Sequence, residues 1–350
     1  MPPLIQDTLT WAWAYVQHVV IMFYWAWVPG FLAAALLSAR YRPALAAITL
    51  RERAGPRAFW AAIGWGMTSG AGRRTSLETA RTLWRQGLPD HTVLAYLVAS
   101  HILGLYSLVL FTILIGLEFA LGVFLGGLAM VGLLRLLAPA RSSGGGRAPN
   151  PTEEVAIPSV GSWRVLVGSA RGWGQVVRDV GRYVRNVGLS LIGGLVLGAL
   201  VLAIDTRGSW VFPQWMGDET LAAALAGSFL APLLSVVLFL APGGNLIVVS
   251  SIWKTWTLAY SGLISFVLMG LLNPLTVRTL LHQYSGTRGW WLVLALYLSA
   301  ALGGLAVSGL FVVLGVQVTH VPWFRELVDK LMMMFPFTMW GAPGGGMRGM

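Results

Sequence analysis

The chain has 350 residues and contains no cysteine. Structural disulfides, thiolate metal sites and cysteine nucleophiles are therefore excluded. The five histidines are scattered along the chain and lack the spacing of metal ligands. We therefore expect neither a metal site nor a cofactor.

Charged residues are also scarce. They make up 11% of the chain, whereas 56% of the residues are hydrophobic and the mean hydropathy is +0.71. Soluble domains carry about 25% charged residues. Because so few charges cannot cover a surface that faces water, we expect a multi-pass protein of the cell membrane, with the lipid bilayer as its surroundings.

Lysines and acidic residues are few beside the arginines. Two lysines and 22 arginines stand against 13 acidic residues, which gives a net charge of +11. The arginines lie between apolar runs, where cytoplasmic loops and anionic lipid headgroups account for them, so we expect no nucleic-acid partner. The chain also lacks the Gly-x-x-x-x-Gly-Lys-Ser/Thr segment of a nucleotide-binding domain. A pump that hydrolyses ATP itself is therefore not expected.

The apolar runs that are present follow the same order in each half of the chain. Each half starts with a span, continues with a hairpin that has a Gly-rich tip, and ends with two spans. In the first half, a basic loop at 40–57 follows the first apolar run, which covers residues 9–38. Either Glu118 or a break at 100–104 marks the turn between the last two spans of this half. Thr75 and Glu78 have the spacing of a capping box, which predicts a helix with Thr75 as its N-cap.

Composition divides the chain into four parts. A Gly-, Pro- and Ser-rich polar segment at 139–158 is the one clear linker, and the arginine-rich stretch after it reads as a helix on the membrane surface. The predicted parts are a first membrane repeat at 1–138, a cytoplasmic linker and surface helix at 139–185, a second membrane repeat at 186–318, and an amphipathic, flexible tail at 319–350.

A short internal similarity supports a repeat. Residues 125–133 and 302–310 are identical at seven of nine positions, although chance similarity between runs of small residues is the alternative. The basic segments at 40–57 and 139–185 are both expected on the cytoplasmic side, with two spans and a hairpin between them. Together with the first span, this gives each half an odd number of crossings, which inverts the second half. We therefore expect an all-α polytopic fold of two inverted repeats, each with three spans and a helical hairpin, and about 8–10 transmembrane segments in all.

The hairpin tips, at 69–75 and 242–245, carry the candidate chemistry. Each tip precedes a helix, so free N–H groups and the positive end of a helix dipole point at it, and Arg73 and Arg74 strengthen a preference for anions. His101 and Asn273 lie 29 residues after Gly72 and Gly244, within apolar spans. The candidate binding residues are Ser69, Gly70, Gly72, Arg73, Arg74, Thr75, His101, Gly243, Gly244, Asn245 and Asn273.

Each candidate has a plainer interpretation. The arginines of the first tip are equally consistent with a cytoplasmic basic face. The glycines serve simply as turn residues in that case, and His101 and Asn273 form hydrogen bonds between helices.

Three stretches of the chain resemble a known family. Residues 83–89 (LWRQGLP) are followed by residues 95–100 (AYLVAS), and a run at 31–37 (FLAAALL) precedes both. These segments are similar to a predicted permease family that includes the organoarsenical efflux permeases, and the resemblance covers most of both halves. It implies a permease. Many members carry Cys-Ser-Cys where this chain has Gly72-Arg73-Arg74, and a proline where it has His101, which argues against thiolate handling of trivalent arsenic.

The sequence therefore favours a permease, not an enzyme, for a small polar solute that binds at the two tips. A membrane scaffold or partner subunit without transport is the main alternative. An intramembrane enzyme acting on lipids is weaker, because neither tip has a carboxylate or histidine beside it. A homo-oligomer stays open, and the sequence does not identify the solute, the direction of transport or its energy source.

Overall fold

The computed structural model describes most of both halves of the chain. The described residues are 5–10, 12–13, 28–52, 55–138, 163–205, 213–217, 220–238, 240, 242–255, 258–284 and 286–316. The predicted linker at 139–158 and the predicted tail at 319–350 lie outside them, as do residues 11 and 14–27 of the first apolar run at 9–38.

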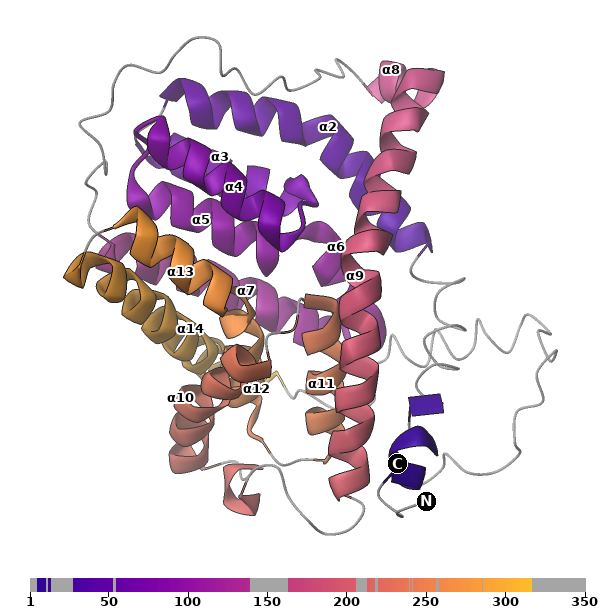
Figure 1. Cartoon of the computed structure of the whole chain (residues 1–350), viewed down its shortest axis with the longest axis vertical. Coiled ribbons are helices and arrows are strands. Elements are labelled where there is room, and N and C mark those ends of the chain that lie inside the picture. The colour runs from indigo at the N-terminus through magenta and orange to yellow at the C-terminus, as the bar shows by residue number, and fades with distance from the viewer. Residues whose placement is uncertain are drawn as a thin grey trace, which may run out of the picture.

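All regular elements among the described residues are helical (Figure 1). The elements of the first half are α2 (Val28–Glu52), α3 (Pro56–Ser69), α4 (Arg73–Arg85), α5 (Asp90–His101), α6 (Leu105–Leu114) and α7 (Leu117–Leu137). Those that follow are α8 (Trp163–Gly168), α9 (Ala170–Asp205), η2 (Gln214–Gly217), α10 (Leu221–Leu238), α11 (Pro242–Thr255), α12 (Tyr260–Leu268), η3 (Met269–Leu271), α13 (Pro274–Gln283) and α14 (Thr287–Val313).

Glycine and proline set the helix boundaries of the first half. Helix α3 starts at Pro56 after Gly55, and the hairpin turns at Gly70, which adopts the left-handed conformation (φ 54°). Helix α4 ends before Gly87, and α5 begins after Pro89. The predicted turn between the last two spans lies at residues 115–116, just before Glu118, whereas residues 102–104 break the preceding span into α5 and α6.

The two halves meet along α7 and α14, which pack against each other. Their backbones approach closely at a pair of glycines, because a Cβ atom added at Gly303 would lie 2.9 Å from the carbonyl oxygen of Gly126. Helix α9 forms another contact, since it packs against α2 of the first half and against α11 of the second (Figure 1). Small residues at these crossings let the helices come close, as they do in membrane bundles.

Six helices among the described residues are long and apolar enough to span a membrane. They are Val28–Glu52, Asp90–Ile113, Leu117–Leu137, Ala170–Ile204, Leu221–Leu238 and Thr287–Val313. A seventh span is added if the pair Tyr260–Leu271 and Pro274–Gln283, bent by 56°, counts as one. The expected 8–10 segments are too many for this part of the chain, because the helices α3, α4 and α11 are shorter than a bilayer is thick.

Two further predictions about local structure were wrong. The basic stretch expected to be a loop at 40–57 is helical as far as Glu52, because Ala- and Leu-rich sequence continues α2 past its arginines. The helix expected to start at Thr75 starts at Arg73, with Gly72 as its N-cap and no capping side chain. Thr75 therefore lies inside the first turn of α4 and not before it.

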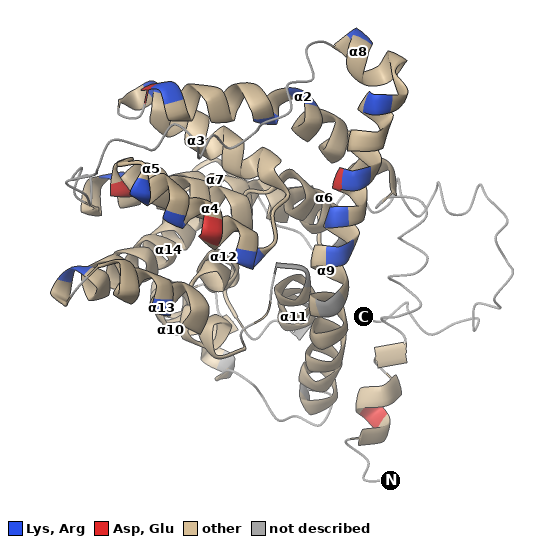
Figure 2. Cartoon of the chain, turned by 45° about the horizontal axis from the view of Figure 1, so that its top comes forward, with Lys and Arg blue, Asp and Glu red and all other residues tan. Residues whose placement is uncertain are grey.

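Helix α9 crosses the boundary that the sequence suggested at residue 185. It runs without a break for 36 residues, from the arginine-rich segment into the apolar one. Figure 2 shows that the arginines of α9 lie on its first half only, and that α10 carries no charge. The basic segment is therefore continuous with a membrane span.

Candidate functional site

Arg73, the first residue of α4, reaches from the first half of the chain into the second. Its Nη2 atom donates to the carbonyl oxygen of Leu240, at 2.6 Å, and to that of Gly270, at 3.5 Å. Leu240 lies just before the second hairpin tip, and Gly270 lies in η3, where the bent span breaks. One guanidinium therefore joins the first tip, the second tip and the broken span.

Asn245, in the first turn of α11, lies at the same place. Its side chain is almost fully buried, with 2% of the residue exposed, and Nδ2 is 3.4 Å from the Oγ atom of Ser235. A Cβ atom added at Gly270 would lie 2.6 Å from Nδ2 of Asn245. The absence of a side chain at Gly270 thus admits Asn245 beside the carbonyl group that Arg73 contacts.

His101 is the third polar group of this region. It ends α5 and is 3% exposed, and α5 packs against α4, which begins with Arg73, and against η3, which contains Gly270. Its Nδ1 atom lies 3.0 Å from the carbonyl oxygen of Leu97 and 3.1 Å from the Oγ atom of Ser100. The half-buried Arg73 and the buried His101 and Asn245 therefore form one polar group, which we call the central cluster.

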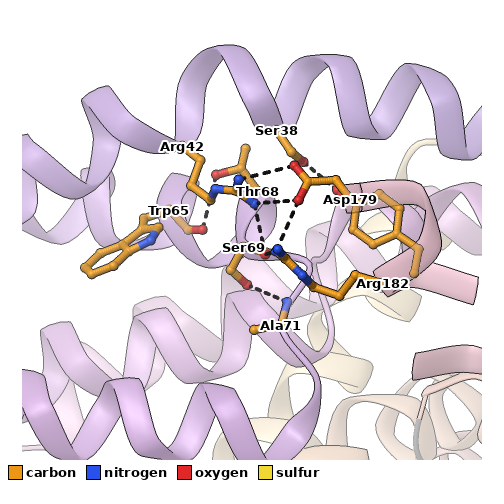
Figure 3. Close-up of polar contacts among 9 residues, drawn as sticks. Ser38, Arg42, Trp65, Thr68, Ser69, Ala71, Asp179 and Arg182 are labelled. Atoms are coloured by element: carbon orange, nitrogen blue, oxygen red, sulfur yellow. Dashed lines mark hydrogen bonds and ion pairs between the residues drawn. The ribbon is translucent and has the colours of Figure 1, made fainter. Parts of the chain in front are cut away.

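A charged network holds the C-terminal end of α3, where the first tip begins (Figure 3). Arg42 of α2 and Arg182 of α9 both donate to the carbonyl oxygen of Ser69, each at 3.4 Å. The same two arginines form ion pairs with Asp179, each with a nitrogen-to-oxygen distance of 3.2 Å, and the Asp179 side chain is 1% exposed. Cations at a helix C-terminus interact favourably with its dipole, so the network fixes the end of α3.

The next residues of α9 hold the tip itself. A Cβ atom added at Gly70 would lie 2.1 Å from the ring of Tyr183, and the carbonyl oxygen of Gly70 accepts a hydrogen bond from Asn186, at 3.0 Å. Oδ1 of Asn186 would lie 2.9 Å from a Cβ atom at Gly72. Asp179, Tyr183 and Asn186 share one face of α9 by their spacing, so this face encloses the turn that leads to Arg73.

The same helix contacts the second tip in a different way. A Cβ atom added at Gly244 would lie 2.3 Å from the carbonyl oxygen of Ser190, and one added at Gly194 would lie 2.5 Å from the carbonyl oxygen of Gly244. The backbones of α9 and α11 are therefore in direct contact. Helix α9 touches both hairpin tips.

Several predicted residues lie elsewhere or have another role. The Arg74 side chain is 88% exposed and pairs with Glu78, and Thr75 is exposed as well. Asn273 caps α13 by accepting a hydrogen bond from the backbone N–H of Thr276, at 3.0 Å. Gly243 lies in the first turn of α11, beside Gly244. The structure thus gathers Arg73, His101 and Asn245, and it leaves Arg74 and Thr75 outside.

Sequence reasoning missed Asp179, Arg42 and Asn186. Asp179 did carry a signal, because it is the only acidic residue in the arginine-rich stretch 163–204. The partners of Arg42 could not be read from the sequence, since 137 positions separate it from Asp179.

A second buried junction between the halves was also missed. Asp90, at the start of α5, accepts hydrogen bonds from Tyr284 and Arg288. The Asp90 side chain is fully buried, and the Nη2 atom of Arg288 lies 2.5 Å from its Oδ2 atom. This contact joins α5 to the turn between α13 and α14.

Comparisons with known proteins agree with a membrane bundle of this kind. Residues 9–309 match the family ArsP_1, which is described as a predicted permease. No curated protein matched the chain significantly, and neither did any solved structure. Because the match covers most of the chain, including both hairpins and the central cluster, this multi-pass membrane protein belongs to the predicted permease family.

Proposed function

We propose that the chain is a permease of the cell membrane that moves a small polar solute, with anions preferred, through the central cluster. The observation that carries this proposal is the position of Arg73. Its half-buried guanidinium joins both hairpin tips and the broken span. A cation placed between two helix N-termini is a suitable binding group for an anion.

The arrangement of the two halves supports the proposal. Gly126 and Gly303 hold the same position in the two similar segments 125–133 and 302–310, and they meet where α7 crosses α14. His101 and Asn273 each lie where a span breaks, between α5 and α6 and between η3 and α13. These correspondences favour an inverted repeat, in which transporters place their sites at broken helices near the midplane of the bilayer.

The contacts of α9 suggest how the site would change during transport. Because α9 holds the first tip through ion pairs and the second only through close backbone contact, a shift of this helix would move the first tip relative to the second. A solute that binds Arg73 would compete with the carbonyl groups of Leu240 and Gly270 for the same N–H donors. Binding and movement of the second tip are therefore linked in this proposal.

The absence of native cysteine allows a direct test. We would replace Arg73 and Asn245 singly by cysteine, and measure labelling by a membrane-impermeant thiol reagent from each side of the membrane. Inorganic phosphate, sulfate, bicarbonate and nitrate would serve as candidate solutes. We expect both cysteines to be labelled, and we expect at least one of these anions to slow the labelling of Asn245→Cys, which keeps Arg73.

Arg74→Cys is the matched control, because Arg74 is the neighbour of Arg73 but has an exposed side chain. It should react quickly whatever anion is present. If Arg73→Cys reacts in the same way as this control and Asn245→Cys never reacts, the tips are a surface loop and a packing element. The proposed transport site would then be wrong.

A further inference from the structure

Two acceptor atoms in the central cluster have no hydrogen-bond partner among the residues that the structure describes. They are Nε2 of His101 and Oδ1 of Asn245. Both side chains are almost fully buried, at 3% and 2% exposure, and they come from opposite halves of the chain. Buried polar atoms usually have a partner, so each unsatisfied atom calls for an explanation.

The contacts of His101 identify Nε2 as an acceptor. The carbonyl oxygen of Leu97 can only accept, so the hydrogen of the neutral ring lies on Nδ1, which faces it. The hydroxyl group of Ser100 donates its own hydrogen to the same carbonyl oxygen, so its oxygen can accept a hydrogen bond from Nδ1. Nε2 therefore carries a lone pair.

The cluster thus combines one strong donor with two acceptors. Arg73 offers N–H groups to an oxyanion, whereas His101 and Asn245 can receive hydrogen bonds only from a ligand that itself carries O–H or N–H groups. A fully deprotonated oxyanion satisfies Arg73 but leaves both acceptors without a partner.

We propose that the site takes a hydroxyl-bearing oxyanion, whose oxygen binds Arg73 and whose O–H group donates to His101 or Asn245. This inference rests on the proposed transport function. An anion of the same shape without a hydroxyl group is rejected. Sites built to receive a hydrogen bond discriminate strongly against analogues that lack the donor. One unsatisfied buried acceptor should lower affinity by about 5- to 150-fold.

Two pairs of inorganic anions test this inference. Bicarbonate and nitrate are both planar with a single charge, and only bicarbonate has a hydroxyl group. Phosphate and sulfate are both tetrahedral, and only phosphate keeps a proton at neutral pH. The midpoint of thermal unfolding of the purified full chain, measured against anion concentration, gives an apparent affinity for each. The same titration of Arg73→Gln measures the change in this midpoint that comes from salt in general, and this change is subtracted from that of the wild-type chain.

We expect the wild-type chain to prefer bicarbonate over nitrate, and phosphate over sulfate, by about 10-fold or more. His101→Gln keeps an acceptor and should retain part of the preference, whereas His101→Phe should lose it. Asn245→Leu tests the second acceptor in the same way.

The outcomes separate the inference from the function on which it rests. If both members of each pair bind equally well and Arg73→Gln abolishes the stabilisation, the hydroxyl requirement is overturned. The anion site itself then stands. Stabilisation by none of the four anions overturns both.

Discussion

The two hairpin tips meet the same helix, yet α9 holds them in different ways. At the first tip, Arg42, Arg182 and Asp179 fix the end of α3 through ion pairs and hydrogen bonds to Ser69. At the second tip, the backbones of α9 and α11 touch at Gly194 and Gly244. The first contact depends on charge, and the second depends on the absence of side chains.

This difference indicates a division of roles. A buried ion-pair network is specific in direction and costly to break, so it suits a part that must keep its position. A contact between small residues lets helices slide or separate without leaving a charge unpaired. We infer that the second tip is the part that moves more easily, and that the first tip stays with α9.

The largest effect is expected at Asp179. Asp179→Asn removes the anion between Arg42 and Arg182. Arg42, whose side chain is 15% exposed, is then left beside a second cation without its buried partner, and stability should fall by about 3–5 kcal/mol. Thermal unfolding of the purified variant measures this loss. Glu78→Gln is the control, because it removes the exposed pair with Arg74 and should cost about 1 kcal/mol or less. Equal effects of the two changes would contradict the anchoring role of the network.

Gly70→Ala should have the next largest effect. It places a side chain at φ 54° and against the ring of Tyr183, which itself packs between Phe31 and Tyr106. Strain and overpacking together should cost about 2–4 kcal/mol. Gly87→Ala has a similarly positive φ of 81° but open space around it, so only the strain of about 1–2 kcal/mol applies. Chemical or thermal unfolding of both variants would show whether Tyr183 makes the difference.

At the second tip, Gly244→Ala should push α11 away from α9, because its Cβ atom would meet the carbonyl oxygen of Ser190. The expected cost is about 1–3 kcal/mol. Gly188→Ala on α9 faces open space and should leave stability unchanged or raise it by up to about 1 kcal/mol. If Gly244→Ala is as harmless as this control, the close contact between the two backbones is not present in solution.

The smallest effect concerns Asn273. If its role is to cap α13, Asn273→Ala should cost about 1 kcal/mol, and Asn273→Ser should recover most of that loss. Anion binding should be unchanged in both variants. A loss of anion affinity with Asn273→Ser would instead place this side chain in the solute site.

Apolar runs predicted most of the spans because length and hydropathy decide which segments enter a bilayer. The helix boundaries at Gly87, Pro89 and the break after His101 were also readable, since turn residues and polar interruptions mark them locally. The continuity of α9 was not readable. Its arginines suggested an interfacial segment, whereas contacts with Arg42 and the first tip hold this part of the helix against the protein.

The candidate site was predictable as two Gly-rich tips but not residue by residue. Arg73 and Arg74 are indistinguishable in the sequence, and only helical geometry turns one toward Leu240 and the other toward solvent. Asn245 was chosen as part of the second tip, and it lies beside Gly270, whose carbonyl group Arg73 contacts. His101 was chosen as a polar residue within an apolar span. Asn273 was chosen for the same reason and is a helix cap, which shows that polarity alone does not identify a ligand.

The central claim is that the two hairpin tips form one site, and cross-linking within a single chain tests it most directly. Cysteines at Arg73 and Asn245 in the otherwise cysteine-free protein would be treated with a short bifunctional thiol reagent in native membranes. We predict an efficient intramolecular cross-link between these two positions, and a poor one when the first cysteine is at Arg74. Equal cross-linking of the two pairs, or none with Arg73→Cys, would contradict a shared site at the tips.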